Sequence, residues 1–513
     1  MRMAQFRGAI QILWSRQFEL ELLQQDCACA DEADPPKIIW QPAGAWPEDD
    51  CACASVSHVS GLAQPLPPAA RLQRTGDLYQ APLSDEYTCY YAPLGSGGVV
   101  VLNRLARRIL SAFASPATAE EACRSLPGLP PDDVDRAVGQ LAAVGLLQPE
   151  GGAPVLGEAV HATLSAWLHV TSACNLRCTY CYAPRGGPPM AEATGLAALD
   201  AVFGTAARYG YAAVKLKYAG GEPLLNFGLV YRLHAQALEK AGDLGLDEVV
   251  LSNGTLLTDE ILGIFRQTGL RLMISLDGTG PGHDAQRPAA DQRGSARQVM
   301  RNIDRALAQG VSPHLSITLT GQEVQGAADA VRFALERNLT FNLNFVREQA
   351  ARPGCWTVDE VSLIEAARRA FRAIESSLPR HSLVAGVLDR ASFAAPHRLP
   401  CGAGHHYLVI GPEGGVARCQ MDLDRPVSDV WARDPLGEVR AAHGTFANLP
   451  VEERDGCRTC PWRYACGGGC PRLAYQVHGR DGAASPYCRV YRTLYPELLR
   501  LEGLRLLQEG TRA

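Results

Sequence analysis

Residues 166–181 read AWLHVTSACNLRCTYC, a short apolar run followed directly by three cysteines. The run 166–171 has the length and composition of a buried strand. Cys174, Cys178 and Cys181 then lie in the loop that leaves its carboxyl end. Thiolates are soft ligands that suit iron–sulfur clusters or zinc. A structural zinc site is closed by four ligands, so three cysteines leave a metal position open for chemistry.

Five further strand-like runs follow, with helical stretches between them. They are AAVKLKYA (212–219), DEVVLS (247–252), RLMISL (271–276), HLSITLT (314–320) and TFNLNFV (340–346). Six strands alternating with helices predict an α/β fold with a parallel sheet and right-handed crossovers over residues 160–385. The natural closure is a partial (β/α)6 barrel of the TIM type, with catalytic groups at the carboxyl ends of the strands.

Short motifs follow three of these strands. Gly-Gly-Glu-Pro occupies 220–223, Ser-Asn-Gly-Thr occupies 252–255, and Ser-Leu-Asp-Gly occupies 275–278. Arg287 lies twelve residues after Ser275. Because the carboxyl ends of parallel strands share one edge, we expect these motifs to meet the cysteine loop.

The Cys-x3-Cys-x2-Cys spacing, with these motifs in order on successive strands, resembles the radical S-adenosylmethionine superfamily. The resemblance implies a 4Fe–4S cluster on Cys174, Cys178 and Cys181, with S-adenosylmethionine on its fourth iron. One electron from that cluster would yield a 5′-deoxyadenosyl radical, while the protein orients the reactants and excludes water.

The same resemblance implies residues that bind S-adenosylmethionine. Glu222, beside Gly220 and Gly221, would pair with the methionine amino group; Ser252 and Asn253 would suit the ribose; Ser275 and Arg287 would contact the methionine carboxylate; Tyr180 would pack by the adenine; and Asp277 would position the cofactor. The Arg287 contact would be a charge-assisted hydrogen bond. No catalytic base is identified.

A second cysteine group fills the cysteine- and glycine-rich segment 395–495, which is too poor in long apolar runs to fold without metal. Its members are Cys401, Cys419, Cys457, Cys460, Cys466, Cys470 and Cys488. The pattern resembles the SPASM domain of peptide-modifying radical enzymes. That resemblance implies two auxiliary 4Fe–4S clusters, one on Cys457, Cys460, Cys466 and Cys488 and the other on Cys401, Cys419 and Cys470. The latter either keeps an open iron for a substrate thiolate or takes a fourth ligand from among Cys355, His405 and His406. Two zinc sites are the alternative to both clusters.

Residues 71–150 form a compact unit upstream of the barrel. Strand-like DLYQAPL and EYTCYYAPL precede three helical stretches, which predicts a small winged-helix module. It resembles the modules that recognise leader peptides of ribosomally made peptides, where the leader adds as a strand to a sheet edge. A last helix is expected within residues 496–513.

Residues 1–70 are expected to be an irregular extension, apart from an amphipathic helix that places Leu13 on its apolar face. Asp-Cys-Ala-Cys-Ala occurs at 26–30 and again at 50–54. Three interpretations remain open: an embedded substrate or substrate mimic, a separate metal site, or chance cysteines in a disordered tail.

Bulk composition excludes several functions. The net charge of −5 gives no reason to expect a nucleic-acid or anionic-membrane partner. No run of 18 uncharged apolar residues suggests a membrane span. We therefore expect a cytoplasmic protein, where 17 cysteines indicate metal ligation rather than disulfides.

Together these patterns predict a peptide maturase that forms a thioether or carbon–carbon crosslink. Its expected partners are a precursor peptide or protein and a low-potential electron donor such as flavodoxin or ferredoxin. The enzymatic alternative is an anaerobic sulfatase-maturating enzyme that forms formylglycine. The non-enzymatic alternative is a zinc-binding peptide scaffold.

Overall fold

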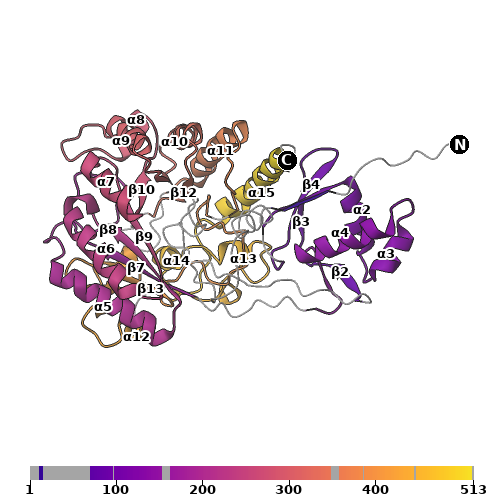
Figure 1. The fold of residues 1–513 in the computed structure, drawn as a ribbon, viewed down its shortest axis with the longest axis horizontal. Coiled ribbons are helices and arrows are strands. Elements are labelled where there is room, and N and C mark those ends of the chain that lie inside the picture. The colour runs from indigo at the N-terminus through magenta and orange to yellow at the C-terminus, as the bar shows by residue number, and fades with distance from the viewer. Residues whose placement is uncertain are drawn as a thin grey trace, which may run out of the picture.

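The computed structural model describes residues 11–14, 70–95, 98–152, 162–347, 358–384, 386–443 and 446–510. Both Asp-Cys-Ala-Cys-Ala segments and Cys355 lie outside these ranges. Two bodies are visible in Figure 1, a large one built on a barrel-like sheet and a smaller N-terminal module, with the last helix between them.

A parallel sheet forms the centre of the larger body. Its six successive strands are β7 (Thr163–His169), β8 (Ala213–Ala219), β9 (Gly245–Ser252), β10 (Arg271–Ser275), β11 (His314–Leu319) and β12 (Phe341–Phe345). Neighbours in the chain are neighbours in the sheet, and each pair is parallel. All six predicted strands are confirmed, since short, mostly apolar runs between helical stretches suit strands of a central parallel sheet.

Helices cover the outer face of this sheet (Figure 1). They are α5 (Glu192–Tyr209), α6 (Phe227–Ala241), α7 (Asp259–Thr268), α8 (Pro281–Gln286), α9 (Ala296–Ala308), α10 (Gly326–Glu336) and α11 (Glu360–Ser376). In α9, Val299, Ile303 and Ala306 are buried at helical spacing. Such a stripe packs on the strands and leaves the carboxyl ends of the sheet free for a site.

The cysteine-rich segment shares this sheet instead of folding beside it. β13 (Tyr407–Ile410) pairs parallel with β7, and β14 (Gly415–Ala417) and β15 (Ser428–Asp429) extend the sheet further. The expected boundary at residue 395 therefore does not separate two sheets. The first strand of an open barrel leaves an unpaired edge, and β13 covers it.

Short helices complete the C-terminal segment. They are α12 (Pro435–Ala441), α13 (Arg463–Cys466) and α14 (Pro471–His478). The 3-10 turns η2 (Gln420–Asp422) and η3 (Val451–Glu453) lie in the same segment, and a third turn, η1 (Pro223–Asn226), follows β8 in the barrel. Among the described residues, no helix is both long and apolar enough to span a bilayer.

The N-terminal module is an antiparallel sheet followed by three helices, as expected. β3 (Tyr79–Pro82), β4 (Tyr87–Tyr91) and β5 (Val100–Asn103) form a meander; α2 (Arg104–Ala112), α3 (Ala119–Ser125) and α4 (Pro131–Ala143) follow; and β2 (Leu72–Arg74) pairs with β6 (Leu147–Pro149). Thr118 and Glu121 close the start of α3 with reciprocal side-chain-to-backbone hydrogen bonds.

The expected N-terminal helix is wrong where the structure describes it. Residues 12–14 form strand β1 (Ile12–Trp14), which pairs antiparallel with β5. The reason is tertiary, because β5 offers an open edge and β-branched or aromatic residues suit a half-buried strand. Gln11 strengthens the contact by accepting hydrogen bonds from Asn103 N (3.2 Å) and Tyr87 Oη (2.6 Å).

The last helix, α15 (Cys488–Gly510), joins the two bodies (Figure 1). It begins eight residues earlier than expected and contains Pro496. A Cβ on Gly503 would lie 3.0 Å from Cys89 Cβ, so the helix lies directly against β4. At its other side, Tyr495 Oη donates to Arg390 O (2.6 Å).

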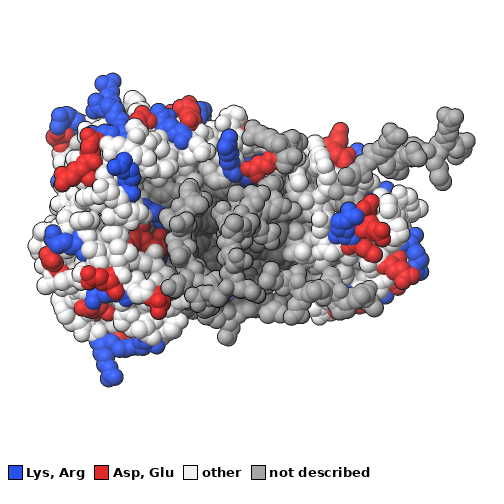
Figure 2. All heavy atoms as spheres, viewed as in Figure 1, with Lys and Arg blue, Asp and Glu red and all other residues white. Residues whose placement is uncertain are grey.

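Surface charge agrees with the composition. On the face shown in Figure 2, acidic and basic side chains are interspersed over the barrel and the module. They do not gather into a patch of one sign on that face.

Candidate active site

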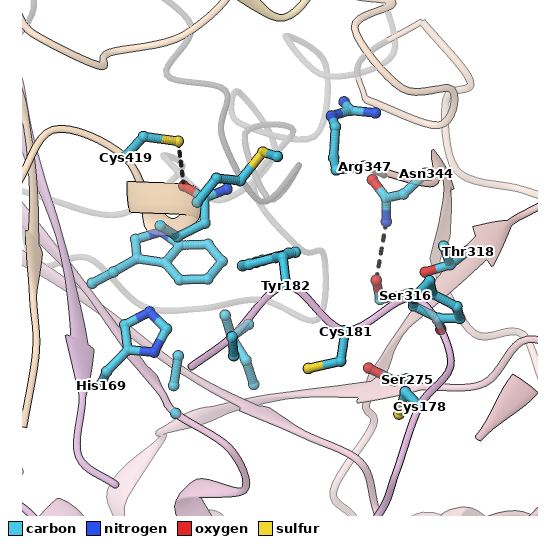
Figure 3. Close-up of a pocket in the computed structure, with 18 of the residues that line it drawn as sticks. His169, Cys178, Cys181, Tyr182, Ser275, Ser316, Thr318, Asn344, Arg347 and Cys419 are labelled. Carbon is cyan, nitrogen blue, oxygen red and sulfur yellow. Dashed lines mark hydrogen bonds between the residues drawn. The ribbon is translucent and has the colours of Figure 1, made fainter. Parts of the chain in front are cut away.

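The carboxyl ends of the parallel strands open into one cavity, whose space of about 1770 Å³ includes the open solvent at its mouth. Cys174, Cys178 and Cys181 line it. Three cysteines of the C-terminal segment line the same cavity, namely Cys401, Cys419 and Cys470. Figure 3 shows His169, Tyr182 and Cys419 on one side, with Asn344 and Arg347 on another. The two cysteine sets therefore face a shared space.

The glycine pair after β8 touches the cysteine loop. Gly221 N donates to Thr171 O (2.8 Å), and Glu222 N donates to Ala173 O (2.9 Å). A Cβ on Gly220 would lie 2.4 Å from Thr171 O, and one on Gly221 would lie 2.2 Å from Ala173 O. Both positions therefore require glycine for the loop to approach this closely.

Glu222 is fully buried and is not among the residues that line the cavity. Its carboxylate accepts hydrogen bonds from Asn253 N (2.7 Å), Ser252 Oγ (2.8 Å) and Leu224 N (3.1 Å). Burial raises its pKa to about 7, and these donors oppose the rise. Here Glu222 ties the end of β8 to the end of β9, and its expected contact with a methionine amino group stays a prediction.

Arg287 reaches the cavity and is held by Asp277. Asp277 is 1% exposed and accepts hydrogen bonds from Arg287 Nε (2.7 Å), Thr318 N (2.8 Å) and the Tyr180 hydroxyl. Arg287 Cζ lies 5.2 Å from the centre of the Tyr180 ring, and Nη1 lies 3.9 Å from Cys178 Sγ. Asp277 thus positions the guanidinium beside the cysteine loop, and Asp277 itself does not line the cavity.

Ser252, Asn253 and Ser275 line the cavity as well. Asn253 Nδ2 donates to Asn175 Oδ1 (2.9 Å) and lies 4.0 Å from Cys174 Sγ. The strand-end motifs and the cysteine loop are therefore brought together at the edge where the sequence places them.

Comparison with known families accounts for this arrangement. A family model described as the radical SAM superfamily matches residues 168–334, from β7 into α10. The matched stretch holds the three cysteines and all three strand-end motifs. Residues 168–334 are therefore a radical SAM region.

Curated relatives extend the similarity beyond the matched stretch. A serine-type anaerobic sulfatase-maturating enzyme of Klebsiella aerogenes is 27% identical over 351 residues, covering 64% of this chain and 83% of the relative. A PqqA peptide cyclase of Methylocella silvestris is 26% identical over 335 residues, covering 63% of this chain and 86% of the relative.

A solved structure shares the fold. Native anSMEcpe with bound AdoMet and the Kp18Cys peptide superposes with a TM-score of 0.56 at 17% identity. The match covers 68% of this chain and all of that one. The chain therefore has the expected partial-barrel fold, with an antiparallel N-terminal module added.

The cysteine loop fits an iron–sulfur cluster. Burial raises the pKa of Cys174 and Cys178, so thiolates there need a cation. The charges of Cys178 and Cys181 raise the pKa of Cys174 further, so the three thiols lie near one another, as the ligands of one 4Fe–4S cluster would.

The seven C-terminal cysteines fall into two groups in space. Burial raises the pKa of Cys466 to about 12, and the neighbouring thiolates of Cys457, Cys460 and Cys488 add to the rise. The other three line the cavity. This division coincides with the two ligand sets that the SPASM pattern implies. His405 Nε2 lies 3.1 Å from Asn448 O, and neither His405 nor His406 lines the cavity.

Sequence reasoning missed several cavity residues. Arg347 Nη2 donates to both oxygens of Asp389, at 2.6 and 2.8 Å, and both side chains line the cavity. Asn344 is the last but one residue of β12 and Arg347 follows its end, so the rule that sites lie at strand ends could have identified both. Nothing in the sequence marks Asp389, which a loop brings back beside β12.

His169 was missed too, because it lies within β7 and not after it. It is 4% exposed, and its Nε2 has no hydrogen-bond partner in the described part of the chain. Trp167 stacks near it, with ring centroids 6.1 Å apart. Burial lowers the pKa of His169 to about 4, so its ring is neutral at pH 7.

This burial predicts a pH dependence of stability. Between pH 6.5 and about 4 the unfolded chain binds a proton at His169 and the folded chain does not. The free energy of unfolding therefore falls with falling pH by about 1 kcal/mol per pH unit from this residue. We expect His169→Phe to make that slope shallower by this amount in urea unfolding, and His443→Phe, at an exposed histidine, to leave it unchanged. Equal slopes for wild type and His169→Phe would show that the ring is protonated in the fold.

Proposed function

We propose that this radical SAM enzyme modifies a ribosomally made peptide or protein by forming a thioether or carbon–carbon crosslink. The observation that carries the proposal is the shared cavity, onto which the Cys174, Cys178 and Cys181 loop and the C-terminal cysteine set both open. A substrate placed there would lie between two cluster sites. The named activities of the sulfatase-maturating and PqqA-cyclising relatives support a peptidyl substrate.

Three 4Fe–4S clusters and S-adenosylmethionine are the proposed cofactors. Cys174, Cys178 and Cys181 would hold the first cluster; Cys457, Cys460, Cys466 and Cys488 the second; and Cys401, Cys419 and Cys470 the third. The bound cluster and S-adenosylmethionine supply a 5′-deoxyadenosyl radical that abstracts a hydrogen atom from the substrate. A low-potential donor such as flavodoxin or ferredoxin would provide the electron.

The chain's own residues bind and orient the reactants. Arg287, positioned by Asp277, presents a fixed cation beside Cys178, suited to the methionine carboxylate. Ser252, Asn253 and Ser275 offer hydrogen-bonding groups on the same wall. His169 is a neutral imidazole that lines the cavity, and its ring nitrogens offer hydrogen bonds to a substrate group.

Formation of formylglycine is the second candidate, because a sulfatase-maturating enzyme is among the relatives. The N-terminal module, with its sheet edges, favours a peptide bound through a leader segment. A hydrazide probe separates the two products, because it labels the aldehyde of formylglycine and does not label a crosslink.

The first test is metal content and cofactor cleavage. After anaerobic reconstitution with iron and sulfide, we expect about twelve irons per chain and release of 5′-deoxyadenosine from S-adenosylmethionine with a chemical reductant. Colourless protein that holds zinc and no iron would contradict the proposal and support the peptide scaffold.

A further inference from the structure

The outer edge of β5 is paired with the chain's own N-terminal segment, strand β1. Ile12 pairs with Leu102 and Trp14 with Val100. Successive side chains of a strand point to opposite faces, and here Ile12 packs against the module core while Leu13 packs against the main core. A Cβ on Gly510 would lie 2.9 Å from Leu13 Cδ1, so this strand is held between the sheet and the end of α15.

The length of helix α15 gives the distance from β1 to the cavity. Leu13 contacts its last residue, Gly510, whereas Tyr491 Oη, near its start, donates to Asp389 (3.2 Å), which lines the cavity. Nineteen residues of helix separate these points, which is about 30 Å. The thirteen residues from Trp14 to Cys27 span up to about 45 Å when extended. The first Cys-Ala-Cys segment can therefore reach the cavity, and the second has more chain still.

The cavity and these segments have complementary charge. Five arginines line the cavity, namely Arg185, Arg287, Arg347, Arg390 and Arg472, and Asp389 is the acidic lining residue among those described. Arg287, Arg347 and Arg472 form ion pairs with the buried Asp277, Asp389 and Asp422. Arg185 is exposed and forms no ion pair with another described residue, so its charge is the one available to an acidic segment. Acidic side chains flank both cysteine pairs, namely Asp26, Asp31, Glu32, Glu48, Asp49 and Asp50. The alanines between the cysteines are small enough to let a backbone approach a cavity wall.

We infer that residues 11–54 are a tethered peptide ligand of this enzyme's own cavity, with residues 11–14 as the docking strand and the two Asp-Cys-Ala-Cys-Ala segments as the part delivered. The inference rests on the proposed function and makes it specific, because it names an acidic, cysteine-bearing peptide as the class that the cavity accepts. An external peptide of this kind would have to displace β1 to use the same edge.

Thiol alkylation of the full, cluster-loaded chain tests the inference without measuring catalysis. Cys27, Cys29, Cys51 and Cys53 are alkylated anaerobically with iodoacetamide, and their rates are read by peptide mass mapping. We expect slow alkylation in the wild type. Leu13→Asp puts a charge between β5 and α15, and should accelerate all four rates about tenfold or more by releasing the strand. Arg185→Glu should accelerate them too, because it repels the acidic flanks.

Matched substitutions on exposed helix surfaces serve as controls. Leu238→Asp, at a side chain that is 57% exposed on α6, and Arg301→Glu on α9 should leave the rates unchanged. The alkylation rate of Cys123 in α3 reports whether the module stays folded in Leu13→Asp. If the module unfolds in Leu13→Asp, the test rests on Arg185→Glu, because Arg185 is exposed and lies outside the module.

Two results would overturn the inference. One is wild-type alkylation as fast as that of a free peptide of the same sequence. The other is alkylation that stays slow in both variants. If a zinc chelator then makes it fast, the four cysteines belong to a metal site instead. Release of 5′-deoxyadenosine is measured on the same samples, so failure of the inference is distinguishable from failure of the proposed function.

Discussion

Replacing Cys174, Cys178 and Cys181 together by alanine is expected to lower the iron content from about twelve to about eight per chain. Release of 5′-deoxyadenosine should fall below detection, at least about 1000-fold, because the electron that cleaves S-adenosylmethionine reaches it through this cluster. Iron analysis and chromatography of the nucleoside products measure the two effects.

The position of the loop makes this expectation specific to one site. The seven C-terminal cysteines lie on other elements, and four of them surround one another away from the loop. Cys123→Ala is the matched control, since Cys123 lies in α3 of the N-terminal module, and it should retain iron and cleavage. If the triple variant still cleaves S-adenosylmethionine, the cluster that cleaves it is not held by these three cysteines.

The barrel could be predicted from sequence because its strands are buried on both faces. Such strands are short and mostly apolar, which sets 213–219 and 314–319 apart from the longer amphipathic helices, although Lys215 and Lys217 lie within the first of them. The site followed from the barrel, since Gly221, Asn253 and Arg287 come shortly after strands whose carboxyl ends meet. These are local signals, and they need no knowledge of the partners that each segment finally contacts.

What could not be predicted depends on pairing between distant segments. β1 and β13 are runs of three and four residues, too short to show a period, and each forms because a sheet edge is open beside it. Arg347 and Asp389 meet only because the chain returns beside β12. The three hydrogen bonds that the Glu222 carboxylate accepts from buried donors likewise depend on segments that meet only in three dimensions.

Gly221→Ala is expected to disturb the first cluster nearly as strongly as replacement of Cys174, Cys178 and Cys181 does. The new methyl group would lie 2.2 Å from Ala173 O and 2.9 Å from Cys174 Cβ, far inside van der Waals contact. Relief requires the backbone of 173–174 to move, since no flexible side chain can yield, and that movement displaces the first cluster ligand. We expect the free energy of unfolding to fall by about 1–3 kcal/mol.

Cluster binding should respond more strongly than stability does, because a displaced thiolate no longer reaches its iron. We expect Gly221→Ala to lose about four irons and its cleavage of S-adenosylmethionine while the auxiliary clusters stay bound. Gly204→Ala is the matched control, because no atom lies within 4 Å of a Cβ at this exposed position of α5. That change should stabilise the helix by about 0.5–1 kcal/mol and keep all iron. A Gly221→Ala enzyme with full iron would show that the loop has room to shift, and that the glycine is required instead for the approach of the cofactor.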